Sequence, residues 1–189
     1  MGDNGYYWQE GPARLRPHRP DDWQSKWAEG LDSEARRLLL GAVEPPCLPE
    51  TIRRRYEREE GFDGVDDRLS LAIETLDGDF AGWVTLYAID RENGTFGLSF
   101  GVFPEFRRRG LALAACRLVL RYAFGELRLM KCNSACLDDN APSAALHRRL
   151  GFQPEGCRRQ SVFTGGRYHD QLLFGLTAGE FADWDGRAQ

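Results

Sequence analysis

The chain has 189 residues, of which 42% are hydrophobic and 29% are charged. This length and apolar content predict one domain with a full core, and no run of about 18 apolar residues is present that could cross a membrane. The formal net charge of −4 provides no general attraction to nucleic acid and mildly favours a cationic partner. Residues 1–20 lack a charged segment followed by an apolar one, so we expect a cytoplasmic protein.

The first third of the chain predicts a short strand followed by three helices. Residues 13–17 alternate as a strand does, and helices are expected over residues 21–29, from about 32 to 40 and over 50–60. Pro45, Pro46 and Pro49 are expected to break the chain before the third helix. The order of these elements gives a helical segment between the first strand and the rest of the sheet.

The remaining chain predicts a meander followed by alternating helices and strands. From Arg68 apolar residues recur with a period of two, and Asp77-Gly78 and Asn93-Gly94 mark tight turns, which predicts three antiparallel strands. A helix over 110–124, a strand over 131–136, a helix over 142–150 and strands over 153–163 and 167–176 follow. We expect an N-terminal extension at 1–12, one domain at 13–177 and a frayed, polar C-terminal tail at 178–189.

Five cysteines form an odd set without the spacing of a zinc site. We therefore expect reduced thiols, no disulfide framework and no metal. Cys132 and Cys136 are expected to share one face of a strand, where burial as small apolar side chains is favoured over a redox pair.

Residues 107–112, Arg-Arg-Arg-Gly-Leu-Ala, lie between a strand closed by Pro104 and an apolar helix. Gly110 lacks a Cβ where a ligand would approach the backbone, and the first N–H groups of a helix have no partner within the helix. These amides, the helix dipole and three guanidinium groups predict a phosphate site. A solvated basic turn is the alternative for the arginines taken alone.

Several further motifs follow this loop in register. They are Asn140 with Ser143, Leu150-Gly151-Phe152, Glu155-Gly156, and Tyr168-His169-Asp170 after Gly165-Gly166. Together with Arg107-x-x-Gly110-x-Ala112 they resemble the GCN5-related N-acetyltransferase (GNAT) superfamily, in its RimJ/RimL-like branch, over most of the chain. The resemblance implies an α/β (α+β) fold whose central, mixed but mostly antiparallel and strongly twisted sheet has about 6–7 strands, flanked by about 4–5 helices.

The resemblance also implies acetyl-CoA as cosubstrate and direct transfer of its acetyl group to a primary amine through a ternary complex. It assigns the pyrophosphate of acetyl-CoA to Arg107, Arg108, Arg109, Gly110, Leu111 and Ala112. Gly101 predicts a bulge in the preceding strand, because a glycine inside a strand often marks one. Such a bulge would free the peptide groups of Phe100, Val102 and Phe103 for the pantetheine amides.

Two polar residues at the start of the helix at 142–150 complete the implied site. The resemblance assigns Asn140 to hydrogen bonding with the pantetheine arm and Ser143 to protonation of the leaving thiolate. Asn before Ala-Pro is also a common helix N-cap, and a structural role for Ser143 is equally open.

The proton acceptor for the amine is not identified by the motifs. An ammonium has no lone pair, so transfer requires a base or a water chain. RimL-like enzymes use a glutamate after Glu-Gly, but residues 160–163 contain no carboxylate. Asp170 and Tyr168 join Ser143 in the predicted catalytic set, and the other candidates, each also explained as a strand-edge or turn residue, are His169, Asp138 and Asp90.

Other functions and partners were weighed against this one. The missing carboxylate motivates a non-catalytic acyl-CoA-binding regulatory module as the alternative, whereas the net charge disfavours nucleic-acid binding through the arginines. The expected partners are a small-molecule amine or a protein N-terminus, no membrane, and a second copy in a homodimer. Trp23 and Trp27, the acidic residues 29, 32 and 34, and the loops 45–49 and 61–67 are candidates for shaping the acceptor site, although Trp23 and Trp27 fit core packing better.

Overall fold

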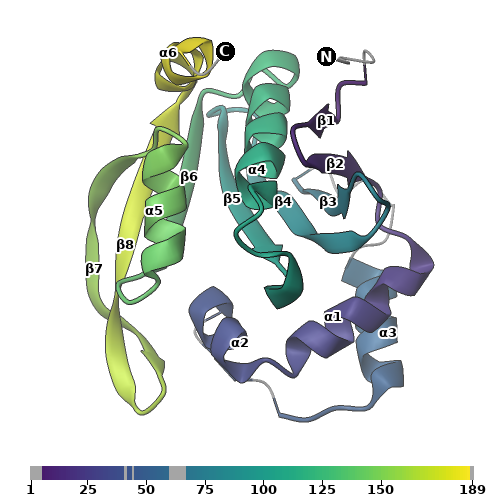
Figure 1. Ribbon diagram of the computed structural model, residues 1–189. Coiled ribbons are helices and arrows are strands. Elements are labelled where there is room, and N and C mark those ends of the chain that lie inside the picture. Colours follow the sequence, from purple (N-terminus) through teal and green to yellow (C-terminus); the bar gives the residue numbers. More distant parts are fainter. Residues whose placement is uncertain (1–5, 41, 44, 60–66, 188–189) are drawn as a thin grey trace. The chain divides into compact units, whose positions relative to one another are not determined.

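The computed structural model describes residues 6–40, 42–43, 45–59 and 67–187. The chain forms two compact units, one from Met1–His18 and Val65–Met130 and the other from Arg19–Gly64 and Lys131–Gln189. Eight strands and six α-helices are present in the described residues (Figure 1), and their mixed α/β architecture with antiparallel pairing confirms the predicted fold class. None of the described helices is both long and apolar enough to span a membrane.

The first unit is an antiparallel sheet with one long helix on it. Its strands pair in the order β1 (Gln9–Glu10), β2 (Ala13–Arg16), β3 (Leu69–Thr75), β4 (Phe80–Asp90) and β5 (Thr95–Val102). The predicted meander β3-β4-β5 is confirmed, and its turns contain Gly78 and Gly94 at φ angles of 94° and 67°, which glycine adopts without strain. β1 was not predicted, because a strand of two residues carries no readable period.

The helix α4 (Leu111–Arg121) covers the apolar face of this sheet. Leu15 and Ile73 lie opposite one another on β2 and β3 and are fully buried, and the ring of Phe96 on β5 lies 5.4 Å from that of Phe124 just beyond α4. The described part of the predicted N-terminal extension is bound to the same helix, since the Glu10 carboxylate pairs with Arg117 at 2.9 Å and also with Arg121.

The opposite face of β2, β3 and β4 carries a buried polar network. Arg16 donates to Glu74 at 2.7 Å, and the hydroxyl groups of Ser70 and Thr85 lie 2.9 Å apart, with His18 hydrogen-bonded to Ser70 at 3.1 Å. Each of these five buried or half-buried side chains therefore has a hydrogen-bond partner, as burial requires.

No bulge interrupts the pairing of β5 with β4 at Gly101, because the two strands pair regularly from Gly82 opposite Val102 to Tyr87 opposite Gly97. Gly101 instead lies opposite Trp83, and a Cβ on it would lie 2.8 Å from the indole Nε1. The glycine is required because the Trp83 ring lies across the neighbouring strand, so the register of β5 depends on an aromatic cross-strand contact.

The second unit combines three helices with a three-stranded antiparallel sheet. The helices are α1 (Trp23–Gly30), α2 (Ser33–Leu40) and α3 (Pro49–Glu59), and a 3-10 turn at Pro20–Asp22 precedes them. The sheet has the order β6 (Lys131–Leu137), β8 (Arg167–Thr177) and β7 (Gln153–Thr164), and it is accompanied by α5 (Ala141–Arg149) and α6 (Ala178–Arg187). Pro49 begins α3 rather than breaking the chain, since proline fits the first helical turn.

The frayed tail predicted after residue 177 is wrong over Ala178–Arg187, which form α6. Thr177 and Glu180 make a capping box, in which the Glu180 N–H donates to Thr177 Oγ1 at 3.3 Å and the Thr177 N–H donates to Glu180 Oε2 at 2.8 Å. Phe181 is buried and its ring lies 5.7 Å from that of Trp184. The Thr-x-x-Glu pattern of a helix start is therefore present in the sequence, although the polar composition of the segment favoured a tail.

The contact between Gly101 and Trp83 gives a prediction for stability. Replacing Gly101 with Val should lower the free energy of unfolding by about 1–3 kcal/mol, because the added atoms overlap the indole. Ser99→Val on the same face of β5 is the control, since Ser99 already has a Cβ there, and it should have the smaller effect. Urea denaturation measures both, and equal losses would contradict the steric account.

Candidate functional site

The N-terminus of α4 lies directly after β5 and carries no cap from a side chain. The 3-10 turn Pro104–Phe106 and residues 107–110 make the connection. The first bond of the helix runs from the Ala114 N–H to the Gly110 carbonyl at 3.1 Å, so the N–H groups of residues 111–113 have no partner within the helix. The predicted cluster of unpartnered amides is therefore present at the predicted place.

The backbone of the loop before α4 depends on two left-handed residues. Arg108 and Gly110 have φ angles of 63° and 81°. A Cβ on Gly110 would contact only Pro12, at 3.7 Å, so the left-handed conformation and not crowding by the chain requires glycine there. The space beside Gly110 is open for a ligand to approach the backbone.

Two of the three loop arginines are held by backbone carbonyl groups. Arg107 Nε donates to the Val102 carbonyl at 3.0 Å, and Arg109 Nη2 donates to the Glu105 carbonyl at 2.8 Å. The Arg109 guanidinium also lies over the Phe106 ring, 5.4 Å from its centroid. Since each guanidinium has five N–H donors, exposed Arg107 and Arg109 keep donors for phosphate oxygens while their positions are fixed.

The peptide groups of β5 differ in what they can offer. The Phe103 N–H donates to the Ala81 carbonyl at 2.9 Å, so the prediction that it is free is wrong. Antiparallel pairs alternate between residues that bond across the ladder and residues that do not. Because Phe103 bonds towards β4, Val102 and Phe100 direct their peptide groups to the other edge of β5. The Val102 carbonyl there accepts from Arg107.

In the second unit, Asn140 is the N-cap of α5. Its Oδ1 accepts the Ser143 N–H at 3.1 Å, and its Nδ2 donates to the Leu38 carbonyl at 3.3 Å near the end of α2. The capping role considered in the sequence is thus confirmed, and the amide also ties α2 to the start of α5. An amide has two donors and two acceptor sites, so one of each stays available for the predicted pantetheine contact.

Ser143 is half-buried on the first turn of α5, and its hydroxyl is hydrogen-bonded to the Cys136 thiol on β6. Burial raises the pKa of Cys136 above its ordinary value, and the hydrogen bond from Ser143 opposes that rise. Cys132 and Cys136 share the buried face of β6, as predicted. The thiol of Cys136 is therefore kept protonated beside the hydroxyl that the motif assigns to catalysis.

His147, one turn beyond Ser143, is a buried polar residue that the sequence did not reveal. Its Nδ1 donates to the Ser143 carbonyl at 2.8 Å, since a carbonyl can only accept. Burial lowers the pKa of His147, so the ring is neutral and its Nε2 accepts from the Ser134 hydroxyl at 2.8 Å. The ring also stacks on Phe174 at 4.8 Å, which locks α5 onto the sheet of this unit.

Asp170 lies on β8 in the hairpin of β7 and β8, and its side chain forms hydrogen bonds across a bulge in β7. Pairing shifts between Arg158 and Val162, and Gln160 within this bulge has a φ angle of 50°. Asp170 Oδ1 accepts the Gln160 N–H at 2.8 Å and Oδ2 accepts the Cys157 thiol at 3.4 Å. Desolvation and next the hydrogen bond to Asp170 raise the pKa of Cys157. Asp170 therefore has a structural role in the bulge.

Tyr168 lies at the tip of the same hairpin, where 62% of its surface is exposed. Its ring meets that of Phe163, directly opposite on β7, at 5.0 Å. This exposed aromatic pair is a cross-strand contact, and the phenol hydroxyl has no hydrogen bond within the part of the chain that the structure describes.

His169 and Asp138 lie together with Asp139, and their ligand atoms are within 4.8 Å of one another. His169 Nδ1 lies 3.3 Å from Asp138 Oδ1 and 3.2 Å from Asp139 Oδ2. Arg167 Nη2 also pairs with Asp139 at 3.1 Å. The Arg167–Asp139 ion pair and the hydrogen bond of His169 with Asp138 account for the cluster.

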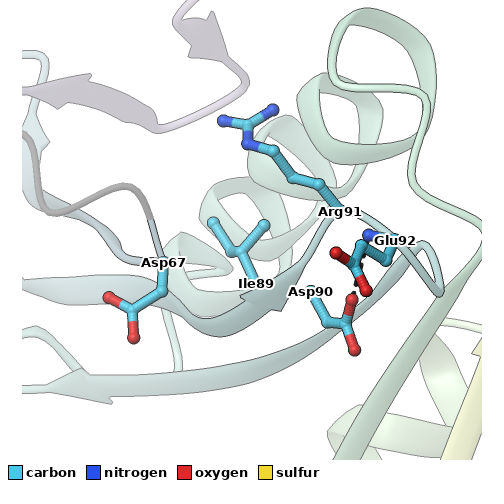
Figure 2. A pocket seen from close by; sticks show the side chains of 5 residues that line it. All are labelled: Asp67, Ile89, Asp90, Arg91 and Glu92. Atoms are coloured by element: carbon cyan, nitrogen blue, oxygen red, sulfur yellow. Dashed lines mark hydrogen bonds between the residues drawn. The ribbon is translucent and has the colours of Figure 1, made fainter.

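The remaining base candidate, Asp90, borders a shallow depression of about 570 Å³ in the first unit (Figure 2). Its carboxylate accepts the backbone N–H groups of Glu92 and Asn93 at 3.0 and 2.9 Å and the Asn93 side chain at 2.7 Å. The hydrogen bond from the Asn93 side chain, followed by that from its backbone, lowers the pKa of Asp90. The turn role considered for Asp90 is therefore confirmed.

The residues suggested for the acceptor are only partly described. Trp23 and Trp27 are half-buried in α1. Asp32 caps α2 by accepting the Ala35 N–H at 3.0 Å, and Glu34 is exposed. The side chain of Glu29, residue 44 and residues 61–66 lie outside the described part of the chain.

Comparison with known proteins gives consistent matches over most of the chain. The family profile described as "Acetyltransferase (GNAT) domain" matches residues 13–153. The SPbeta prophage-derived N-acetyltransferase YokL of Bacillus subtilis (strain 168) is 34% identical over 175 residues, 93% of this chain and 95% of that protein. The spermidine N(1)-acetyltransferase of Escherichia coli (strain K12) is 30% identical over 160 residues, 85% of this chain and 83% of that protein.

A solved structure shares the fold at lower identity. Spermidine N-acetyltransferase from Vibrio cholerae, in complex with CoA and spermine, has a TM-score of 0.80 and 18% identity, covering 92% of this chain and 99% of that chain.

Buried His147 predicts a pH dependence of stability. The folded protein binds a proton at His147 less readily than the unfolded chain, so its stabilising contribution is complete above the ordinary histidine pKa of 6.5 and falls as the pH decreases below that value. We expect the unfolding free energy of His147→Phe to fall less than that of the wild type between about pH 7.5 and about pH 5.5, one pH unit on either side of the ordinary pKa of 6.5. Urea denaturation at several pH values measures this, and parallel pH curves would disprove it.

Proposed function

Because this chain belongs to the GNAT acetyltransferase family and is an acetyl-CoA-dependent N-acetyltransferase, we propose that it transfers the acetyl group directly to a primary amine in a ternary complex. The observation that carries the proposal is the uncapped N-terminus of α4 behind the arginine loop. A small-molecule amine is the acceptor class we favour, because relatives of 30% and 27% identity are named for spermidine and for L-amino acids.

Acetyl-CoA would bind through its pyrophosphate at the start of α4. Three amides of the first turn point along the helix axis, where the dipole favours an anion. Arg107 and Arg109 are already held beside this point, and Arg108 is exposed. The peptide groups of Phe100 and Val102 would form hydrogen bonds with the pantetheine amides. This binding requires the Arg107 side chain to release the Val102 carbonyl.

The transfer itself forms one bond and breaks another. The amine nitrogen attacks the thioester carbonyl carbon, the bond from carbon to sulfur breaks, and the sulfur leaves with a proton that Ser143 supplies. The amine gives up its own proton to water or to a base, and a proton from solvent restores the Ser143 hydroxyl. Asp170 and Tyr168 remain the predicted bases, and a reactive thioester lets positioning provide much of the rate.

The thiols of the chain support direct transfer over an acetylated cysteine. Burial raises the pKa of Cys116 inside α4 and that of Cys136 on β6. The pKa of Cys157 is raised as well. Since a thiolate is the nucleophilic form, none of these three cysteines is prepared for attack on a thioester.

Gly110→Glu tests the cofactor site. The new carboxylate would occupy the place proposed for the pyrophosphate, so we expect binding of acetyl-CoA to be lost in calorimetry. Gly110→Ala is the matched control, because it introduces the same left-handed strain of about 1–2 kcal/mol without a charge. Unchanged affinity in Gly110→Glu would contradict the site, and a loss in both variants would assign the effect to the backbone.

Ser143→Ala tests the proposed proton donor. The backbone N–H that Asn140 accepts stays in place, so α5 keeps its cap and only the hydroxyl is lost. We expect kcat to fall by about 10²-fold with little change in the dissociation constant of acetyl-CoA.

Cys136→Ala, which removes the protein partner of this hydroxyl, should have a much smaller effect on kcat. An unaltered kcat in Ser143→Ala removes Ser143 from the mechanism. Tight binding of acetyl-CoA by the wild type without turnover of any amine would favour a regulatory binding module instead.

A further inference from the structure

Arg37 on α2 is a half-buried cation without a protein partner. Its Nε is buried from solvent and has no hydrogen bond, and the side chain makes no ion pair or hydrogen bond within the described ranges. Glu34, one turn earlier on the same helix, is exposed and does not pair with it. A guanidinium has four further N–H donors on its two Nη atoms, and this half-exposed side chain can offer them to an anion from outside the chain.

Arg37 lies near the turn between β7 and β8, and the residue after it contacts the start of α5. A Cβ on Gly165, in the turn between β7 and β8, would lie 3.3 Å from Arg37 Nη1. The next residue, Leu38, accepts the hydrogen bond from Asn140 Nδ2. Arg37 is therefore held between the hairpin turn and the N-terminus of α5, beside the residues proposed to bind the pantetheine arm and protonate the thiolate.

Apart from the exposed Glu34, two acidic side chains of the second unit are already engaged. Asp139 pairs with Arg167 and His169, and Asp32 caps α2. Neither carboxylate is free to neutralise Arg37 or to attract a polyamine.

We propose that Arg37 binds a carboxylate of the acceptor, so that the substrate is an amine that also carries a carboxylate, such as an amino acid or a short peptide, rather than a polyamine. This inference rests on the proposed transfer to an amine and specifies its substrate class. The planar guanidinium matches a carboxylate in a bidentate pair, and the partly buried site strengthens that pair relative to water.

Matched acceptors test this assignment. Amino acids and the corresponding amino acid amides present the same amine and side chain and differ in the carboxylate. We expect the wild type to acetylate the acid with a kcat/KM at least about tenfold above that for the amide. Arg37→Gln should lower kcat/KM for the acid by about tenfold to a hundredfold and leave that for the amide almost unchanged.

Two further variants separate the shape of the guanidinium from its charge and control for the loss of an arginine elsewhere on the surface. Arg37→Lys keeps the positive charge but loses the planar guanidinium that can donate two parallel hydrogen bonds, so it should retain an intermediate preference for the acid. Arg53→Gln on α3 removes an exposed arginine that pairs with Glu57 at 2.9 Å, and it should not alter the preference.

Thermal stabilisation by each acceptor in the presence of CoA separates substrate class from catalysis. Stabilisation of the wild type by the acid, lost in Arg37→Gln, supports the carboxylate site even if no acceptor is turned over, an outcome that would overturn only the proposed activity. Equal use of acid and amide by the wild type, a preference for spermidine over both, or equal losses in Arg37→Gln would overturn the assignment of Arg37.

Discussion

The start of α4 has three backbone N–H groups that no side chain caps. The packing of the first unit holds these donors in place. The chain keeps these donors in a fixed direction, because α4 buries Leu111, Ala115 and Leu118 against the sheet. The preceding strand is fixed as well, since the Phe103 N–H bonds to the Ala81 carbonyl. The amides are thus placed before a ligand arrives, so binding an anion there requires little ordering of the backbone.

Much of the first unit could be predicted because its signals are local. The period of two in β3 to β5 and the turns at Asp77-Gly78 and Asn93-Gly94 need no knowledge of distant residues. Gly101 shows the limit of such reasoning. A glycine inside a strand indicates either a bulge or a close approach, and only the identity of the residue opposite, Trp83, decides between them.

The second unit was less predictable because its functional contacts join distant segments. The sequence places Asn140 at a helix start, but its bond to Leu38 joins residues 102 positions apart. His147 gives no sequence signal for its role, which depends on Ser134 and on the stack with Phe174. No sequence pattern identifies Arg37 either, because only the burial of its Nε distinguishes it from a solvated arginine. The prediction of a frayed tail over residues 178–187 was wrong for another reason. The polar composition of the segment hides the capping box of Thr177 and Glu180, which begins a helix.

Net charge alone does not specify the charge that an acceptor meets, for a physical reason. The formal charge of −4 suggests attraction of a cation, but many of the carboxylates are consumed within the chain. Glu74 is buried against Arg16, Glu10 bridges two arginines on α4, and Asp90 serves a turn. Screening over a Debye length of about 8–10 Å further restricts a ligand to the charges that it contacts. The charge that a substrate meets is therefore set by which ionic groups lack a partner in the fold, and a count of acidic and basic residues does not contain that information.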